Sequence, residues 1–282
     1  MVKGAELFTS GLASFYTVLE QLTGFDFFTP VTIEHIFQSV GEVNLWEEKK
    51  DQAFHSTYLK RHISNPYPSV KAPLGLGVME NAAWINTVQY LNAHEHYCQN
   101  NGVEISSQHI KQHDIDQYLV KGHEVILCTG HLFKDSGLLP AEIFSPTHGE
   151  VMTIRTSGLP EHTILHSSIF SLPIGNNLFK IGATYQWDNL TDQVTEVGLQ
   201  KLKADLGKIY NGDYTIVEHR AGVRPNTKDR QPIIGKISKN LYTFNGMGSR
   251  AALMTPFLSS VFADFLTKSS PIPEHYNINR FL

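Results

Sequence analysis

The hydrophobic pattern changes character near residue 149, and this change limits the folds that the sequence can adopt. Before it, residues 124–128 form a short continuous apolar run, which is typical of a strand buried on both faces of a parallel sheet. After it, residues 150–154, 164–170 and 178–181 read as alternating strands, which suggest an antiparallel sheet. The sequence therefore predicts a mixed α/β or α+β protein that combines an α/β layer with an antiparallel sheet.

Helices are predicted where apolar residues recur every three or four positions. These segments are residues 5–23, 44–50, 82–100, 195–210 and 253–265. Further strands are expected at residues 31–37, 103–105 and 240–244, with a loop at residues 62–77 and a turn-rich loop between residues 210 and 240. Because the two patterns interleave along the chain, the domains are expected to be discontinuous in sequence.

Composition argues against several classes of protein. The 282 residues include 23 Lys and Arg and 27 Asp and Glu, a net charge of −4, whereas nucleic acid or an anionic membrane requires a basic excess. Cys98 and Cys128 stand in no CxxC pattern, which excludes a disulfide scaffold and a cysteine-rich zinc module. The sequence has no apolar run of about 18 residues, which a transmembrane helix would need. It also has no signal-peptide pattern at its start. We therefore expect a cytoplasmic protein.

The 14 histidines raise the question of a metal site. His109 and His113 stand four residues apart, as do His162 and His166. However, the sequence has no HExxH motif and no carboxylate at a spacing that would complete a ligand set. We expect exposed or hydrogen-bonded histidines and no metal.

A basic segment between residues 219 and 235 is the first motif that could carry chemistry. Four cations fall in eleven residues, and Pro225 and Pro232 stiffen the segment while Gly222 and Gly235 let it bend. A fixed guanidinium such as that of Arg224 can bind a carboxylate or phosphate through two parallel hydrogen bonds. The alternative is a solvated basic turn.

Two glycine-containing turns follow predicted strands. Asn245-Gly-Met-Gly-Ser-Arg250 lies between a strand and the last helix, where free backbone N–H groups favour an electron-rich ring or an anion. Cys128-Thr129-Gly130 ends the apolar strand and fits a turn beneath a cofactor. Each turn alone is equally compatible with an ordinary strand end.

Taken together and in this order, these motifs resemble the D-amino-acid-oxidase-like family of FAD-dependent oxidoreductases, which includes glycine oxidase. Two further segments match that family, namely Pro146-Thr-His-Gly149-Glu150 and Gly182-Ala-Thr184. Within the basic segment, the matching stretch is Gly222-Val-Arg224-Pro225-Asn-Thr227-Lys-Asp229-Arg-Gln-Pro232-Ile-Ile-Gly235. The resemblance covers essentially the whole chain from residue 5 and is strongest from Gly122 onward. The Gly248-Ser-Arg250 form resembles the oxidoreductase domain of the bifunctional enzymes that modify wobble uridine in tRNA.

The sequence departs from the family's pattern at the nucleotide-binding loop. The family opens with a strand, a GxGxxG turn and a helix that bind the FAD pyrophosphate. Gly75-Leu-Gly77 follows a loop and lacks the third glycine, so this sequence is expected to lack that N-terminal unit. The expected FAD-binding, Rossmann-like domain comprises residues 1–24, 75–145 and 235–282, and the expected substrate domain with the antiparallel sheet comprises residues 25–74 and 146–234.

The resemblance implies hydride transfer from the carbon of a small amine or amino acid to FAD. It assigns Arg224 to the substrate carboxylate, and it assigns cofactor contacts to Thr129, Gly130, Gly222, Gly246, Met247, Gly248, Ser249 and Arg250. The alternatives are a catalytically inactive truncated member and a fragment of a split enzyme that does not hold FAD alone. An oligomer or a complementing N-terminal segment is a possible partner; nucleic acid and membrane are not expected.

Overall fold

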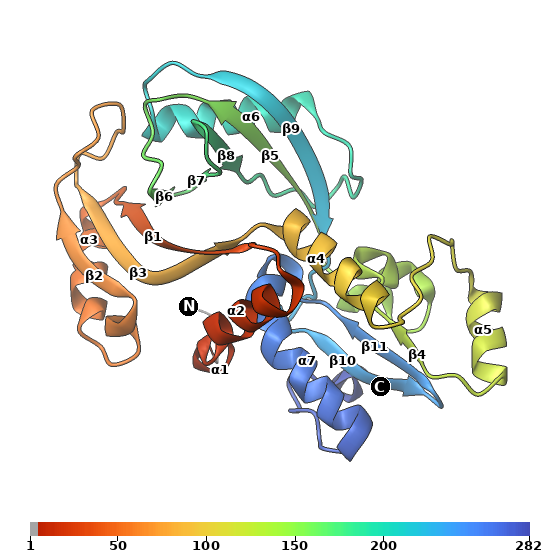
Figure 1. The fold of residues 1–282 in the computed structure, drawn as a ribbon. Helices are drawn as coiled ribbons and strands as arrows, with labels where there is room; N and C mark the ends of the chain where they lie inside the picture. The colour runs from red at the N-terminus through yellow and green to blue at the C-terminus, as the bar shows by residue number, and fades with distance from the viewer. Residues whose placement is uncertain (1–4) are drawn as a thin grey trace. The chain divides into compact units, whose positions relative to one another are not determined.

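The computed structural model describes residues 5–282, which divide into two compact units. Unit 1 comprises residues 1–27, 86–147 and 223–282, and unit 2 comprises residues 28–85 and 148–222. Both units are therefore discontinuous in sequence, and both mix helices with a sheet (Figure 1). The predicted mixed α/β class is confirmed.

Unit 2 is built on an eight-stranded sheet in the order β2-β3-β1-β6-β7-β8-β5-β9. Its strands are β1 (Phe28–Ile36), β2 (Leu59–Ile63), β3 (Leu76–Ile85), β5 (Thr147–Arg155), β6 (Thr163–His166), β7 (Phe170–Pro173), β8 (Leu178–Gly182) and β9 (Thr215–Arg224). Its helices are α3 (Val40–Lys50), the 3-10 turn η1 (His55–Thr57) and α6 (Glu196–Ile209). The pairings of β1 with β3, of β6 with β7, and of β8 with β7 and β5 are antiparallel, whereas β1 and β6 run parallel.

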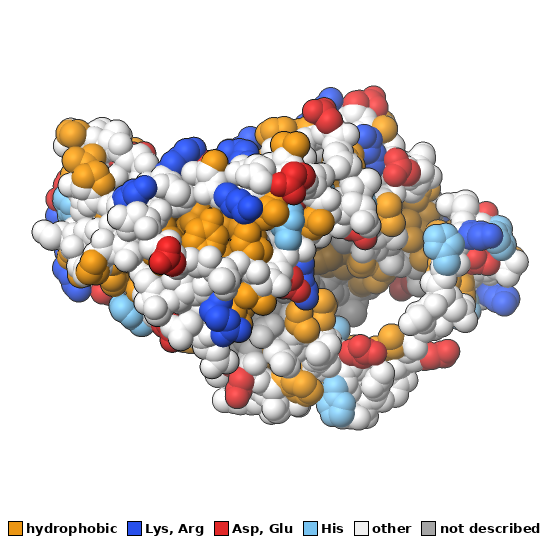
Figure 2. Space-filling model, turned by 90° about the horizontal axis from the view of Figure 1, so that it is seen from above, with side chains coloured by type: hydrophobic (Ala, Val, Ile, Leu, Met, Phe, Trp, Pro, Cys, Tyr) orange, Lys and Arg blue, Asp and Glu red, His pale blue; other side chains and the backbone are white. Residues whose placement is uncertain are grey.

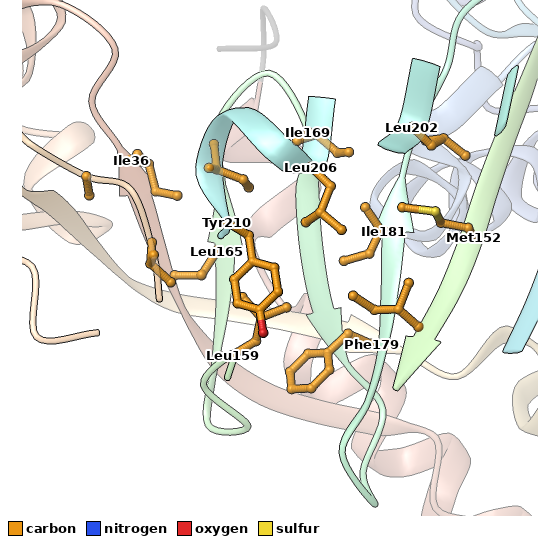
Figure 3. Packing of buried hydrophobic residues seen from close by; sticks show 14 of the residues in the cluster. Ile36, Met152, Leu159, Leu165, Ile169, Phe179, Ile181, Leu202, Leu206 and Tyr210 are labelled. Atoms are coloured by element: carbon orange, nitrogen blue, oxygen red, sulfur yellow. The ribbon is translucent and has the colours of Figure 1, made fainter. Parts of the chain in front are cut away.

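The core of unit 2 lies where α6 packs on this sheet. Leu202 and Leu206 project from α6 toward Ile181 and Met152 on the strands (Figure 3). All four side chains are at most 1% exposed. Alternation along a strand sends every second side chain to this face, which explains the amphipathic pattern of residues 150–181.

Unit 1 contains a three-stranded sheet in the order β10-β11-β4. Its strands are β4 (Val125–Leu127), β10 (Ile233–Ser238) and β11 (Leu241–Asn245). Its helices are α1 (Ala5–Thr9), α2 (Leu12–Thr23), α4 (Thr87–Asn100), α5 (Gln112–Val120), α7 (Ala251–Lys268) and the 3-10 turns η2 (Gly130–Ser136), η3 (Ala141–Ile143), η4 (Gly248–Arg250) and η5 (Ile278–Phe281). The strands β4 and β11 run parallel, and β10 is antiparallel to β11.

Adjacent residues of β10 face opposite sides of this sheet. Ile234 packs with Met254 and Leu258 of α7, whereas Ile233 packs with Phe133 of η2. Two separate apolar clusters thus cover the two faces of the sheet in unit 1.

Several sequence predictions need correction. Trp84 and Ile85 are not helical but end β3, because they pair with Thr29 and Phe28 of β1, and the helix begins only after Asn86 caps it. The predicted strand 103–105 is not formed, and the predicted helix 5–23 is interrupted at Gly11, whose φ is 73°.

The apolar strand before residue 128 is also less buried than predicted. β4 does pair in parallel with β11, but Ile126 is 43% exposed. Among residues 5–282, β4 has a strand partner on only one side, so its other edge is open.

The expected domain boundaries differ from the compact units by two or three residues at 25–27 and 146–147, and by more at two other places. Residues 76–85 pair with β1 and β2 and so lie in unit 2, not with the helices of unit 1. Residues 223–234 lie in unit 1. The reason is that Asn226 and Lys228 hydrogen-bond to the segment 143–147.

Candidate functional site

The strongest candidate site lies at the carboxyl edge of β4 and β11 in unit 1. Because these strands are parallel, the turns that follow them leave the sheet on the same side. Thr129 and Gly130 follow β4, and Gly246 to Ser249 follow β11. We call these residues and the first turn of α7 the carboxyl-edge site.

One buried asparagine joins the two turns. The Asn245 side-chain amide donates a hydrogen bond of 3.0 Å to the carbonyl of Gly130, and its Oδ1 accepts from the Gly246 N–H at 2.8 Å. Asn245 is only 4% exposed. Sequence reasoning did not single it out, although a polar residue that ends a largely apolar strand and precedes glycine was the available signal.

The glycines of this site are required for different reasons. Gly246 has a φ of 80°, and a Cβ there would come within 3.1 Å of the Ile233 backbone N. A Cβ on Gly248 would overlap the Asn226 side chain. Packing within the protein therefore explains both of these glycines.

Gly130 differs because nothing in the described protein fills the space beside it. Its φ is 61°, and a Cβ built there would meet no atom within 4 Å. Thr129 beside it is exposed. The backbone at this point is open to a ligand.

The start of α7 is also open. Arg250 occupies the N-cap position and makes no side-chain capping hydrogen bond. Ser249 and Ala251 are exposed, so the N-terminal end of this 18-residue helix, which carries backbone N–H groups, is accessible to solvent. Such groups attract an anion or an electron-rich ring.

Two predicted cofactor residues have other contacts. The side chain of Met247 is buried in the apolar cluster of α7, which leaves only its backbone for a ligand. The Arg250 guanidinium hydrogen-bonds to the carbonyl of Arg230. It therefore ties the basic loop to the start of α7.

The basic segment is a loop only between residues 225 and 232. Residues 215–224 form β9 and residues 233–238 form β10, so the turn-rich prediction is wrong on both sides of the loop. Asn226 fastens the loop through its side chain to Thr147 Oγ1 at 2.8 Å. Asn226 is a second residue that sequence reasoning missed.

Arg280 anchors the other end of this loop. Its Nε lies 3.0 Å from Asp229 Oδ2, and its Nη2 donates to the carbonyl of Pro232 at 2.8 Å. Burial alone would raise the pKa of Asp229, but hydrogen bonds from Gln231 N–H and Arg280 outweigh it and hold that pKa below its usual range. The loop is thus held at both ends within unit 1.

The remaining predicted residues are not all brought to this site. Arg224 ends β9 and is half-buried in unit 1, where its carbonyl accepts from the Asn226 N–H at 2.9 Å. Gly222 is the last residue of unit 2, and a Cβ there would meet no atom within 4 Å. The roles assigned to Arg224 and Gly222 stay predictions.

Other candidate sites are weaker. Gly77 is not part of a phosphate loop, because it lies in β3 with Phe37 and Trp46 within 2.7 Å of where its Cβ would be. No group of three or more His, Cys, Asp or Glu side chains in residues 5–282 is placed to hold a metal ion. In the same range, no helix combines the length and apolarity needed to cross a bilayer. Charges of both signs are interspersed on the face in Figure 2.

Comparison with protein families gives one match over most of the chain. Residues 5–265 match the sequence model of the family described as FAD dependent oxidoreductase, abbreviated DAO.

Two curated proteins share part of this sequence. The tRNA 5-methylaminomethyl-2-thiouridine biosynthesis bifunctional protein MnmC of Idiomarina loihiensis is 28% identical over 162 residues, which are 54% of this chain and 26% of that protein. The bifunctional protein ThiO/ThiG of a Synechocystis species is 26% identical over 178 residues, 59% of this chain and 27% of that protein. The matched regions thus span about a quarter of these relatives.

Solved structures share the fold at low sequence identity. Iminodiacetate oxidase from a Chelativorans species has a TM-score of 0.79 at 17% identity, covering 98% of this chain and 85% of that one. Glycine oxidase from Bacillus cereus has a TM-score of 0.75 at 16% identity, covering 94% and 81%. An FAD-bound L-α-glycerophosphate oxidase from Mycoplasma pneumoniae has a TM-score of 0.74 at 15% identity, covering 97% and 83%.

Proposed function

Because this chain belongs to the FAD dependent oxidoreductase family, we propose that it oxidises a small amine or amino acid at a C–N bond. When FAD, the cofactor of this family, is bound, it supplies the acceptor for the hydride that leaves the substrate carbon. The resulting imine hydrolyses in water. Among similar structures, glycine oxidase and iminodiacetate oxidase are named for substrates in which an amine stands next to a carboxylate.

The observation that carries this proposal is the open backbone of the carboxyl-edge site. A flat ring could approach Gly130 closely because no side chain occupies the space beside it. The exposed N–H groups at the start of α7 would then stabilise negative charge on the ring. Thr129, Gly246, Gly248 and Ser249 would line the same edge. These residues fit the flavin end of FAD.

We assign the FAD-binding role to unit 1 and the substrate-domain role to unit 2. Arg224 would bind the substrate carboxylate through its planar guanidinium, which positions the α-carbon for oxidation. Oxidation of a neutral amine needs no pair of acid and base residues. The part of the protein is therefore to position the substrate and to supply compensating charge. Tethering by Asn226 and Arg250 would keep the basic loop fixed on unit 1.

The test is flavin retention with a matched pair of glycine variants. FAD is added to the full chain, the excess is removed, and the visible absorption spectrum is recorded. Gly130→Ala and Gly137→Ala both place alanine at a left-handed position, with φ of 61° and 70°, and neither Cβ meets an atom within 4 Å. Both variants therefore carry the same backbone cost of about 1–2 kcal/mol.

We expect Gly130→Ala to lose flavin and Gly137→Ala to retain it like the wild type. Equal retention by both variants would show that no ligand lies against Gly130. In the flavin-loaded protein, Arg224→Ala should raise KM for a carboxylate-bearing amine by about tenfold or more, because a charge-assisted pair is lost. An unchanged KM would refute the role of Arg224.

The second candidate function is a binding module that does not hold FAD alone. The observation that favours it is the open edge of β4 with Ile126 exposed, since an unpaired strand edge is a template for another strand. A complementing segment or a second copy of the chain would pair there. No retained flavin in the wild type, together with self-association that Ile126→Lys abolishes, would favour this alternative.

A further inference from the structure

One pairing of strands joins the two chain segments that make up unit 2. Strands β1 to β3 come from residues 28–85, and strands β5 to β9 come almost entirely from residues 148–222. In the sheet β1 lies beside β6, and among the strands of the described chain this pairing alone links the two segments. It comprises four residue pairs and ends with His35 beside His166. We call it the seam of unit 2.

Two histidines meet at the end of the seam. His35 and His166 are register partners, so their side chains stand on the same face of the sheet. Their rings are tilted by 35° to each other, and their Nδ1 atoms lie 3.1 Å apart. The His35 side chain is 24% exposed and His166 is exposed, so this pair is accessible from solvent.

The distance between the two Nδ1 atoms matches that of neighbouring ligands on a metal ion. Imidazole nitrogens bind zinc at about 2.0–2.1 Å. Two such nitrogens would then lie about 3.3 Å apart on a tetrahedral ion and about 2.9 Å apart on a square-planar ion. The observed 3.1 Å lies between these values. Both nitrogens could therefore bind one ion without the strands moving apart.

Packing and a carboxylate fix the His35 ring. The ring stacks on Trp46 at an angle of 4° and meets Phe37 edge to face. Its other nitrogen, Nε2, lies 3.4 Å from Glu42 Oε2. A histidine that binds a metal usually gives its second ring nitrogen to a carboxylate, a carbonyl or water, which fixes the ring and makes it a better ligand. His35 has this arrangement.

The carboxylate is held in turn by the start of helix α3. Glu42 Oε2 accepts from the Gln38 N–H at 2.8 Å, and the Glu42 N–H donates to Ser39 Oγ at 3.2 Å. Ser39 is the N-cap of α3. These bonds place Glu42 on the first turn of the helix, so the fold itself positions the carboxylate beside His35.

The second histidine is suited to bind as the neutral ring. A metal binds the free lone pair of a neutral imidazole nitrogen. Loss of solvation lowers the pKa of His166, and the nearby His35 lowers it further. Because no group of three or more His, Cys, Asp or Glu side chains in residues 5–282 is placed around an ion, water would complete the coordination. Imidazole ligands suit zinc, nickel and copper, and Cu²⁺ binds most tightly.

We propose that His35 and His166 form a two-histidine site for a late divalent transition-metal ion, Cu²⁺ or Zn²⁺, which staples β1 to β6. The two residues are 131 positions apart in sequence, so the unfolded chain does not hold them together. An ion that binds the folded form more tightly than the unfolded form stabilises it. The ion thus strengthens the seam that closes unit 2.

The first test uses the tryptophan that stacks on His35 as the reporter. In the full chain with Trp84→Phe and Trp187→Phe, Trp46 is the one tryptophan left. Cu²⁺ should quench most of its emission, because copper(II) quenches an indole close to it, and excess EDTA should restore it. Zn²⁺ does not quench, so it should compete and raise the Cu²⁺ concentration needed. Trp46 emission that Cu²⁺ leaves unchanged would overturn the proposal.

Three further substitutions in this background separate the site from the other histidines. His166→Gln removes one ligand and should raise the Cu²⁺ concentration for half-quenching tenfold or more. Glu42→Gln removes the negative charge beside His35 and should raise it about tenfold. His162→Gln, an exposed histidine of the same unit bonded to Tyr67, is the matched control and should leave it unchanged. Equal half-quenching concentrations in His166→Gln and His162→Gln would show that Cu²⁺ binds elsewhere.

The stapling effect is measured on the wild type, so it does not depend on any variant folding. All three tryptophans lie in unit 2, and their fluorescence reports its unfolding by denaturant. At about 100 times its Kd, Zn²⁺ should raise the ratio of folded to unfolded protein by up to about a hundredfold. The denaturant midpoint should rise accordingly and return with EDTA. A midpoint that Zn²⁺ leaves unchanged would refute the staple.

Discussion

The two units differ in how completely each buries its own apolar surface. Unit 2 packs α6 on its eight-stranded sheet around one large core cluster, with a smaller cluster beside α3, whereas the small sheet of unit 1 is divided between two clusters of similar size. Among the described residues, thirteen exposed large apolar side chains belong to unit 1 and eight to unit 2. The difference suggests that unit 1 is the part whose surface a ligand or another segment must cover.

A matched pair of core substitutions would show whether the units unfold separately. Leu206 in unit 2 and Leu258 in unit 1 are both 0% exposed, so replacing either by alanine should cost about 2–5 kcal/mol of unfolding free energy. All three tryptophans lie in unit 2. Tryptophan fluorescence therefore reports on unit 2, while far-ultraviolet circular dichroism reports on both units.

We expect Leu206→Ala to lower the denaturant midpoint seen by fluorescence and Leu258→Ala to leave it unchanged. Circular dichroism should detect both substitutions. If Leu258→Ala moves the fluorescence midpoint as much as Leu206→Ala does, the two units unfold as one and the comparison fails.

A smaller effect is expected when the basic loop of unit 1 loses its anchor. Arg280→Ala removes the ion pair with Asp229 and the bond to the Pro232 carbonyl, so it should destabilise unit 1 by about 1–3 kcal/mol. It should also weaken flavin retention by loosening the loop beside Gly246. Arg155→Ala is the control, because Arg155 is exposed and makes one weak bond to the Asn176 carbonyl in unit 2. If Arg280→Ala unfolds at the same temperature as the wild type when followed by circular dichroism, Arg280 does not anchor the loop.

The smallest effect concerns the pH dependence of unit 2. His35 and His166 join β1 to β6 through an Nδ1–Nδ1 contact of 3.1 Å. Loss of solvation lowers the pKa of His166, and the nearby His35 lowers it further. The folded form thus binds this proton less readily than the unfolded form, so stability should rise with pH up to the ordinary histidine pKa of about 6.5.

The expected gain is below about 1 kcal/mol, because His166 is an exposed residue and solvent screens part of the effect. Fluorescence-detected unfolding at pH 5 and pH 7.5 measures it. His166→Gln should flatten the dependence relative to the wild type and to His162→Gln. An equal slope in all three proteins would assign the pH effect to other groups.

The pattern of apolar residues in the sequence predicted those helices and strands that are stabilised mainly by contacts between residues close in sequence. Helix α6 was predicted within one residue, because its apolar positions, Leu202 and Leu206 among them, recur at helical spacing and Thr195 caps its start. By contrast, Trp84 and Ile85 continue the apolar spacing of the next helix, and only pairing with β1 makes them a strand. β9 was missed because its charged residues and the following Pro225 resemble a loop when its sheet partner is unknown.

The carboxyl-edge site was partly predictable for a similar reason. Glycine turns after apolar strands are visible in sequence, and the parallel pairing of β4 with β11 does bring Gly130 and Gly246 to one edge. Sequence could not show which glycines are packed and which face open space. That distinction depends on Asn226 and Ile233, which approach from the loop and from β10.

The way the chain passes back and forth between the units also has a consequence for synthesis on the ribosome. Strand β1 finds its parallel neighbour β6 only after all of residues 86–147 have been made. Until then the nascent sheet of β1, β2 and β3 presents a bare edge of β1 that another chain could capture. Unit 2 can close once residue 222 has emerged, whereas unit 1 must wait for its last segment, residues 223–282. Translation order therefore lets the self-contained sheet mature first and leaves the cofactor-binding candidate as the last part to assemble.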